Sequence, residues 1–141
     1  MPHTHSRREL LRSAAALLGG ILAFPRAAGA LAGRPFRGPH PEPRPGVTAA
    51  KVIPAVDLGS DADVMATFDK VRRIPEIVDG IRCHCGCADL AGFYSLLSCY
   101  EGAGMARYCW ICQGEGNLVS RLHSEGKTLA EIRDAVDARY G

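Results

Sequence analysis

The sequence has no apolar run of the roughly 20 residues that a membrane-spanning helix needs. It also has no cysteine before Cys83, although six cysteines follow between Cys83 and Cys112. Its formal net charge is only +2. Four of its 17 basic residues, but only one of its 15 acidic residues, precede Gly33, so 13 basic and 14 acidic residues remain after that point. This near-neutral remainder lacks the basic surface on which nucleic-acid binding depends, and we expect no nucleic-acid partner.

Several signatures of catalysis are missing as well. The short glycine runs "GAG" and "GEG" lack the strand and the lysine of a phosphate-binding loop. No serine stands in a nucleophile elbow, and the carboxylates show no pairing suited to acid–base chemistry. These absences favour a binding protein over an enzyme.

The N-terminal residues have the order of parts found in a signal peptide. Two arginines are followed by an uncharged, mostly apolar run from Ala14 to Phe24, and then by a small-x-small cleavage site at Ala28-Gly29-Ala30. We therefore interpret residues 1–30 as a signal peptide. No cysteine directly follows the cleavage site, where a lipid could be attached, so we expect no stable membrane anchor after processing.

The stretch "SRRELLR", which begins at Ser6, resembles the pattern of twin-arginine export signals, with Leu10 in the place of the aromatic residue. The resemblance implies that the twin-arginine export machinery carries an already folded protein to a periplasmic or other extracytoplasmic location. Proteins exported in this way often contain a cofactor.

Residues 31–47 form a predicted proline-rich linker. Its stretch "RPFRGPHPEPRPG" contains five prolines and no apolar periodicity, which favours an extended, polyproline-like chain. His40 lies within it, and we expect this histidine to be solvated. The folded unit is then a cysteine-rich domain at residues 48–141, small enough to need disulfides or a metal for its stability.

The pattern of this domain predicts an all-α fold of about four short helices around the cysteines. Ser60 and Asp63 form a predicted capping box, and Pro75 suits the first turn of a second helix. Thr128 and Glu131 form another capping box ahead of the last helix. One short strand could form in "AAKVIPAV", although its proline weakens that prediction.

The middle of the domain is less regular. Asp89 could cap a helix that carries Cys99 near its end. Gly114 and Gly116 predict a break in the chain before a helix over "NLVSRLHSEG".

The six cysteines follow the pattern C-x-C-x-C, then Cys99, then C-x-x-C. Closely spaced cysteines around the flexible Gly86 can converge on one ion, and a C-x-x-C pair is half of many four-thiolate sites. Soft thiolates select Cu(I), Zn²⁺ or iron–sulfur clusters. The predicted metal ligands are Cys83, Cys85, Cys87, Cys99, Cys109 and Cys112, with His84 as an additional candidate.

Two other interpretations stay open. An exported chain with an even number of cysteines can form a disulfide-stapled interaction domain, and six cysteines allow 15 pairings. Alternatively, Cys109 and Cys112 could be the redox pair of a periplasmic thiol–disulfide oxidoreductase, with Trp110 and Ile111 as an apolar rim. No βαβ pattern surrounds this pair, which excludes a thioredoxin fold.

The stretch "PEIVDGIRCHCGCADLAGFYSLLSCY" followed by "CWICQGE" resembles the exported bacterial proteins named for a PCYCGC motif. Arg82 and His84 stand where that motif has proline and tyrosine, and Phe93 stands where a histidine is expected. The resemblance implies an exported, poorly characterised domain with a metal-binding role.

A shorter resemblance joins "RYCWICQGE" and "EGKTLAEIRDAVDARYG" to the thiol-reducing subunit of cytochrome c maturation (the CcmH/CycL type). It implies a small helical domain in which Cys109 and Cys112 form the redox pair. Here Tyr108 separates Arg107 from Cys109, which departs from the R-C-x-x-C-Q motif of that subunit.

Together these patterns predict an exported metal-binding protein that uses its cysteines to handle or store a metal. Copper or zinc is expected first and an iron–sulfur cluster next. A metal transporter or a metalloenzyme would be the partner.

Overall fold

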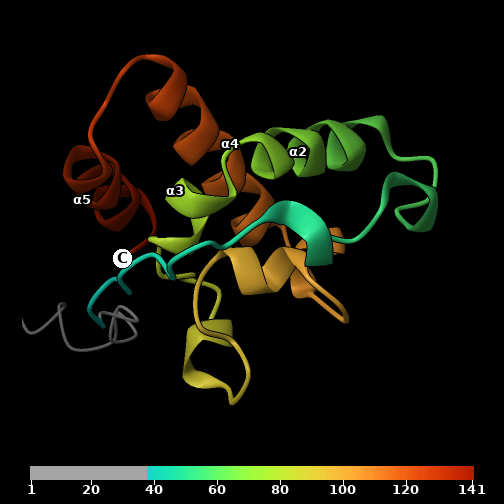
Figure 1. Ribbon diagram of the computed structural model, residues 1–141, viewed down its shortest axis with the longest axis horizontal. Coiled ribbons are helices and arrows are strands. Elements are labelled where there is room, and N and C mark those ends of the chain that lie inside the picture. The colour runs from blue at the N-terminus through green and yellow to red at the C-terminus, as the bar shows by residue number, and fades with distance from the viewer. Residues whose placement is uncertain (1–37) are drawn as a thin grey trace, which may run out of the picture. The chain divides into compact units, whose positions relative to one another are not determined.

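The computed structural model describes residues 38–141. The predicted signal peptide at 1–30 and the start of the predicted linker lie outside the described residues. Within 38–141 the chain forms no strand but four α-helices, α2 (Ala62–Arg73), α3 (Pro75–Asp79), α4 (Trp110–Ser124) and α5 (Leu129–Tyr140) (Figure 1). The predicted all-α fold of about four helices around the cysteines is confirmed.

Five short 3-10 helices complete the described part of the chain. They are η3 (Ala49–Lys51), η4 (Ala55–Asp57), η5 (Cys87–Asp89), η6 (Leu97–Tyr100) and η7 (Met105–Arg107). None of the helices in this part is long and apolar enough to cross a membrane.

Local sequence signals place most of the helix starts. Thr128 and Glu131 form the predicted capping box of α5, and Pro75 occupies the first turn of α3 as predicted. The cap of α2 was predicted one residue too early. The carboxylate of Asp61, rather than the hydroxyl of Ser60, accepts hydrogen bonds from the backbone N–H groups of the first turn, at 3.0 and 3.1 Å.

The predicted break before residue 117 is wrong, because α4 begins at Trp110 and continues through both glycines. The side chain of Tyr100 lies against Gly116, and that of Tyr140 lies against Gly114. A side chain at either position would collide with a tyrosine hydroxyl. The glycines therefore permit close packing of the helix, and this tertiary gain offsets their low helix propensity.

Two other local predictions are also wrong. The stretch "AAKVIPAV" forms η3 and η4, and its only sheet-like contact is an isolated bridge between Val52 and Glu101. Asp89 ends η5 instead of capping a helix, and Cys99 lies in the separate helix η6.

Helix α4 is at the centre of the domain, in contact with α2, α3 and α5 (Figure 1). Phe68 of α2 meets Tyr100 of η6 edge to face, with 4.7 Å between the ring centroids. Val119 of α4 and Ile132 and Val136 of α5 are fully buried between these helices. This core fixes α4 relative to η6, and both helices carry cysteines.

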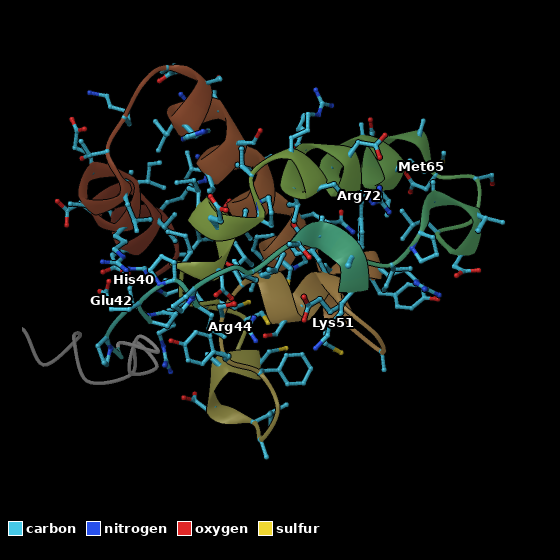
Figure 2. The ribbon with its side chains drawn as sticks, viewed as in Figure 1. His40, Glu42, Arg44, Lys51, Met65 and Arg72 are labelled. Atoms are coloured by element: carbon cyan, nitrogen blue, oxygen red, sulfur yellow. The ribbon has the colours of Figure 1, made fainter. Side chains whose placement is uncertain are left out.

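The described part of the proline-rich segment packs on the domain. Figure 2 shows His40, Glu42 and Arg44 along this one extended stretch. The Arg44 guanidinium donates two hydrogen bonds to the buried Asp79 carboxylate, at 2.7 and 3.1 Å, and Tyr94 donates to the Glu42 carbonyl. The side chain of His40 is only 9 % exposed, so the expectation of a solvated histidine is wrong.

Candidate metal centre

Three separate segments bring cysteines into the core of the domain. Cys83 and Cys85 lie in the connection after α3, Cys99 lies in η6, and Cys112 lies in the first turn of α4. Gly86 follows Cys85 with a φ of 92°, a left-handed conformation that suits glycine and turns the chain sharply. The centre therefore depends on tertiary packing as well as on the C-x-C-x-C spacing.

The sulfur atoms of Cys83, Cys85, Cys99 and Cys112 all lie within 4.8 Å of one another. Three of the side chains are buried, and Cys85 is half-buried. The sulfur of Cys85 is 3.1 Å from that of Cys83 and 3.4 Å from that of Cys112, and Cys83 and Cys112 are 3.6 Å apart. These four cysteines are close enough to hold a metal ion.

None of the six cysteines forms a disulfide. A disulfide has a sulfur–sulfur bond of about 2.05 Å and joins sulfurs in pairs. Here one sulfur, that of Cys85, has three sulfur neighbours within 3.4 Å, namely those of Cys83, Cys87 and Cys112. The arrangement converges on a centre and does not divide into pairs.

The cluster accepts one negative charge easily but resists more. Hydrogen bonds from Cys112 and Cys83 lower the pKa of the Cys85 thiol, because they stabilise its thiolate. Hydrogen bonds with Cys112 and Cys85, together with burial, raise the pKa of Cys83. The hydrogen bond with Cys83 lowers the pKa of Cys112. Hydrogen bonds with Cys85 and Cys99, together with burial, raise it by more, so the pKa of Cys112 lies above its ordinary value. A bound cation would offset the charge repulsion and burial that oppose ionisation of Cys83 and Cys112.

The other two predicted cysteine ligands, Cys87 and Cys109, are not among these four. Cys87 is buried at the start of η5, and its sulfur lies 3.0 Å from that of Cys85. Cys109 is half-buried and precedes the first residue of α4 as its N-cap. Helix α4 thus starts within the C-x-x-C pair, although the glycines had predicted a later start.

His84 is buried beside the cysteines, but its ring faces carboxylates. Nδ1 lies 2.7 Å from Glu115 Oε1, and Nε2 lies 2.9 Å from Asp137 Oδ1. Burial lowers the pKa of His84, but the hydrogen bond and the charge of Glu115 raise it more, so that its pKa lies above the ordinary value. With both nitrogens engaged, His84 holds the cysteine loop in place through hydrogen bonds.

Glu115 is a buried partner of His84 that the sequence did not reveal. Its side chain is fully buried, and Oε1 also accepts a hydrogen bond from the backbone N–H of His84 at 2.8 Å. The other oxygen, Oε2, has no hydrogen-bond partner among the described residues. One signal was available, because Glu115 follows Cys112 by three positions and so shares its face of α4.

A second histidine continues this polar network toward the surface. The backbone N–H of Arg82 donates to His40 Nδ1 at 2.9 Å, so His40 Nε2 carries the proton and donates to Asp137 Oδ1 at 3.0 Å. Asp137 therefore links both histidines to α5. These bonds tie the proline-rich segment, the cysteine loop and α5 together.

The family model described as "Protein of unknown function with PCYCGC motif" matches residues 45–141. This match includes all six cysteines and supports the longer of the two resemblances. The resemblance to the thiol-reducing subunit of cytochrome c maturation has no such support. No curated protein and no solved structure matches the chain.

Proposed function

The chain belongs to the family of proteins of unknown function with a PCYCGC motif, and we propose that it is an exported metal-binding protein that handles or stores a thiophilic ion. The observation that carries this proposal is the convergence of four cysteine sulfurs within 4.8 Å. Copper is the ion to test first, followed by zinc and an iron–sulfur cluster, because thiolates prefer these soft partners.

The sulfur distances support a compact site. A tetrahedral ion with metal–sulfur bonds of about 2.3 Å holds its ligands ~3.8 Å apart. The sulfur–sulfur separations among Cys83, Cys85 and Cys112 run from 3.1 to 3.6 Å, so a small expansion admits one ion. An iron–sulfur cluster needs a wider spacing, because several bridged irons then stand between the thiolates.

Export belongs to the same proposal. The twin-arginine-like signal would deliver a folded chain, and a metal bound before export would protect the thiols from oxidation outside the cytoplasm. In that compartment the protein would exchange its ion with a metal transporter or a metalloenzyme. Blocking the twin-arginine pathway should then leave the metal-bound protein inside the cell.

Cadmium binding by the reduced full chain tests the site, because cadmium–thiolate bonds absorb in the ultraviolet. We compare the wild type with Cys99→Ser, which removes a buried ligand, and with Cys109→Ser as the matched control outside the group of four. Mutating a residue that hydrogen-bonds to a metal ligand weakens metal binding by about 10–100-fold. Removing a ligand itself should therefore weaken cadmium binding at least tenfold. Cys109→Ser should bind as the wild type does.

Circular dichroism of both metal-free variants checks that they retain the helical fold. Equal cadmium affinity in the two variants would refute the assignment of the site. So would a wild-type protein that gives no cadmium–thiolate absorption.

One observation favours a second function, that of a thiol–disulfide oxidoreductase. Helix α4 starts at Trp110, so its N-terminus, which favours negative charge, lies at the half-buried Cys109. The Cys109 thiolate would attack a disulfide of a substrate protein and release one of its sulfurs as a thiolate. The Cys112 thiolate would then displace the second substrate sulfur and form the Cys109–Cys112 disulfide.

Replacing Cys112 with serine tests this alternative, because the second step is lost. Mixed disulfides between Cys109 and partner proteins should then accumulate under oxidising conditions. Their complete absence would count against the oxidoreductase function, whereas cadmium binding would still test the metal function separately.

A further inference from the structure

Cys87 is the one buried thiol in the described residues that the group of four does not use. Its residue is only 4 % exposed, and its sulfur lies 3.0 Å from that of Cys85. Gly86 makes this approach possible, because its left-handed conformation turns the chain back on itself between the two cysteines. A buried polarisable thiol in contact with a metal site is well placed to be a ligand.

Cys85 is the sulfur on which the cluster is centred. It lies within 3.4 Å of the sulfurs of Cys83, Cys87 and Cys112. Cys83, Cys85 and Cys112 form a triangle with edges of 3.1, 3.4 and 3.6 Å. Cys85 also contacts Cys87, which is not part of the group of four.

Cys99 is the member of the group of four that this triangle leaves out. Its sulfur lies within 4.8 Å of that of Cys85, so Cys85 has two further sulfurs near it, those of Cys87 and Cys99. The five buried or half-buried sulfurs therefore divide into two sets of three that share Cys85.

We propose that the centre takes two Cu(I) ions, one held by Cys83, Cys85 and Cys112 and the other by Cys85, Cys87 and Cys99, with the Cys85 thiolate as the bridge. This inference rests on the proposed metal-binding function and specifies its ion and its stoichiometry. Two three-coordinate ions that share one ligand need five thiolates, which is the number that the cluster supplies. Cys109 is left outside.

Zinc distinguishes this arrangement from a simple four-cysteine site. Zn²⁺ in structural sites is almost always four-coordinate, and two such ions cannot each have four separate sulfurs from a set of five. The centre should therefore hold two Cu(I) ions but one Zn²⁺ ion. Binding of two Cu(I) ions converts five thiols to thiolates, and any protons still on the thiols leave to solvent, with no change of oxidation state.

The experiment titrates the reduced full chain with the acetonitrile complex of Cu(I) under argon, and separately with Zn²⁺. We expect an end point of two Cu(I) ions and one Zn²⁺ ion per chain. Cu(I) luminescence and copper–copper scattering in X-ray absorption should appear with the second equivalent, because only a bridged pair places two copper ions close together.

Cys87→Ser should lower the copper end point from two ions to one and abolish the copper–copper signal, while zinc binding stays at one ion. Cys109→Ser is the matched control and should keep both end points. Circular dichroism and the zinc end point of Cys87→Ser show whether that variant still folds. If it does not fold, the copper–copper signal of the wild type decides alone.

The outcomes separate this inference from the proposed function. One Cu(I) ion per wild-type chain, with no copper–copper signal, would overturn the bridged pair but leave a metal site. Failure to bind either Cu(I) or Zn²⁺ would overturn the proposed function as well.

Discussion

Replacing Gly116 with alanine should destabilise the domain, although the same change in an exposed helix would stabilise it. An added Cβ would overlap the hydroxyl of Tyr100, and it would lie 3.0 Å from Tyr100 Cζ and 3.2 Å from Val71 Cγ2. Carbon atoms prefer separations of about 3.5–4.0 Å, so Tyr100 has to move. Tyr100 is fully buried and donates a 2.7 Å hydrogen bond to the Cys112 carbonyl, next to the cysteine cluster.

The size of the effect follows from three contributions. Overpacking a well-filled core costs about 1–3 kcal/mol. Loss of the Tyr100 hydrogen bond costs about 1 kcal/mol more. The better helix propensity of alanine returns up to about 1 kcal/mol. We therefore expect Gly116→Ala to lower the free energy of unfolding by about 1–4 kcal/mol.

Gly114→Ala is the matched control in the same helix. Its Cβ would meet the hydroxyl of Tyr140, which lies at the end of α5 and is half-buried. That ring can move aside, so the propensity gain should leave this variant between neutral and about 1 kcal/mol more stable. Urea unfolding of the reduced, metal-free proteins measures both values. If Gly116→Ala proved as stable as Gly114→Ala, the close packing of Tyr100 on α4 would be refuted.

The remaining predictions concern protons, an ion pair and metal linkage. Because the pKa values of Cys83 and Cys112 are raised, Zn²⁺ binding near neutral pH should release at least two protons. The zinc affinity should therefore rise by at least about 100-fold per pH unit. Calorimetry in buffers of different ionisation enthalpy counts the released protons, and fewer than two would contradict the prediction. Burial would raise the pKa of Asp79, but hydrogen bonds from Arg44 and Ser95 outweigh it and lower that pKa. The contribution of ionised Asp79 to the free energy of unfolding is therefore complete above the unfolded pKa of about 4, and it is lost as the pH falls through the lower folded pKa. Asp79→Asn should lower the free energy of unfolding by about 2 kcal/mol at pH 7 and remove this acid dependence. An unchanged pH profile of unfolding in the variant would contradict the prediction. Zn²⁺ at 100 times its dissociation constant should add about 2.7 kcal/mol to the free energy of unfolding of the wild type. In Cys99→Ser the same zinc concentration should add much less. Urea unfolding with and without zinc measures both values.

Short-range signals made much of the fold predictable. The capping box at Thr128 and Glu131, and the proline at the start of α3, depend on residues within one helical turn, and the structure has both. Helix α4 was misjudged, because the reason for its glycines lies in Tyr100 and Tyr140, which are distant in the sequence. Local propensity contains no information about such contacts.

The candidate site also combines features that the local sequence predicted with features that depend on distant residues. The cysteine spacing predicted a cluster, and four of the six cysteines converge. The spacing could not show that Cys109 lies outside the group, since that depends on where α4 begins. It also could not reveal Glu115, whose role depends on His84 in another segment.

Packing of the proline-rich segment was also beyond local patterns. Its composition predicts an extended chain, but the chain is held by Arg44 on the buried Asp79 and by His40 on Arg82. These partners lie 35 and 42 residues away along the chain. One partner group is the carboxylate of Asp79 and the other is the backbone N–H of Arg82, and neither produces a periodic pattern in the sequence.

The measurement that tests the central claim most directly is elemental analysis of the protein purified through its native export route, with free thiols counted in the same sample. We predict a soft metal at a near-integer ratio to protein. Removing that metal should expose at least four newly titratable thiols at once. A metal-free protein with few free thiols would contradict the account and identify the cysteines as disulfide partners.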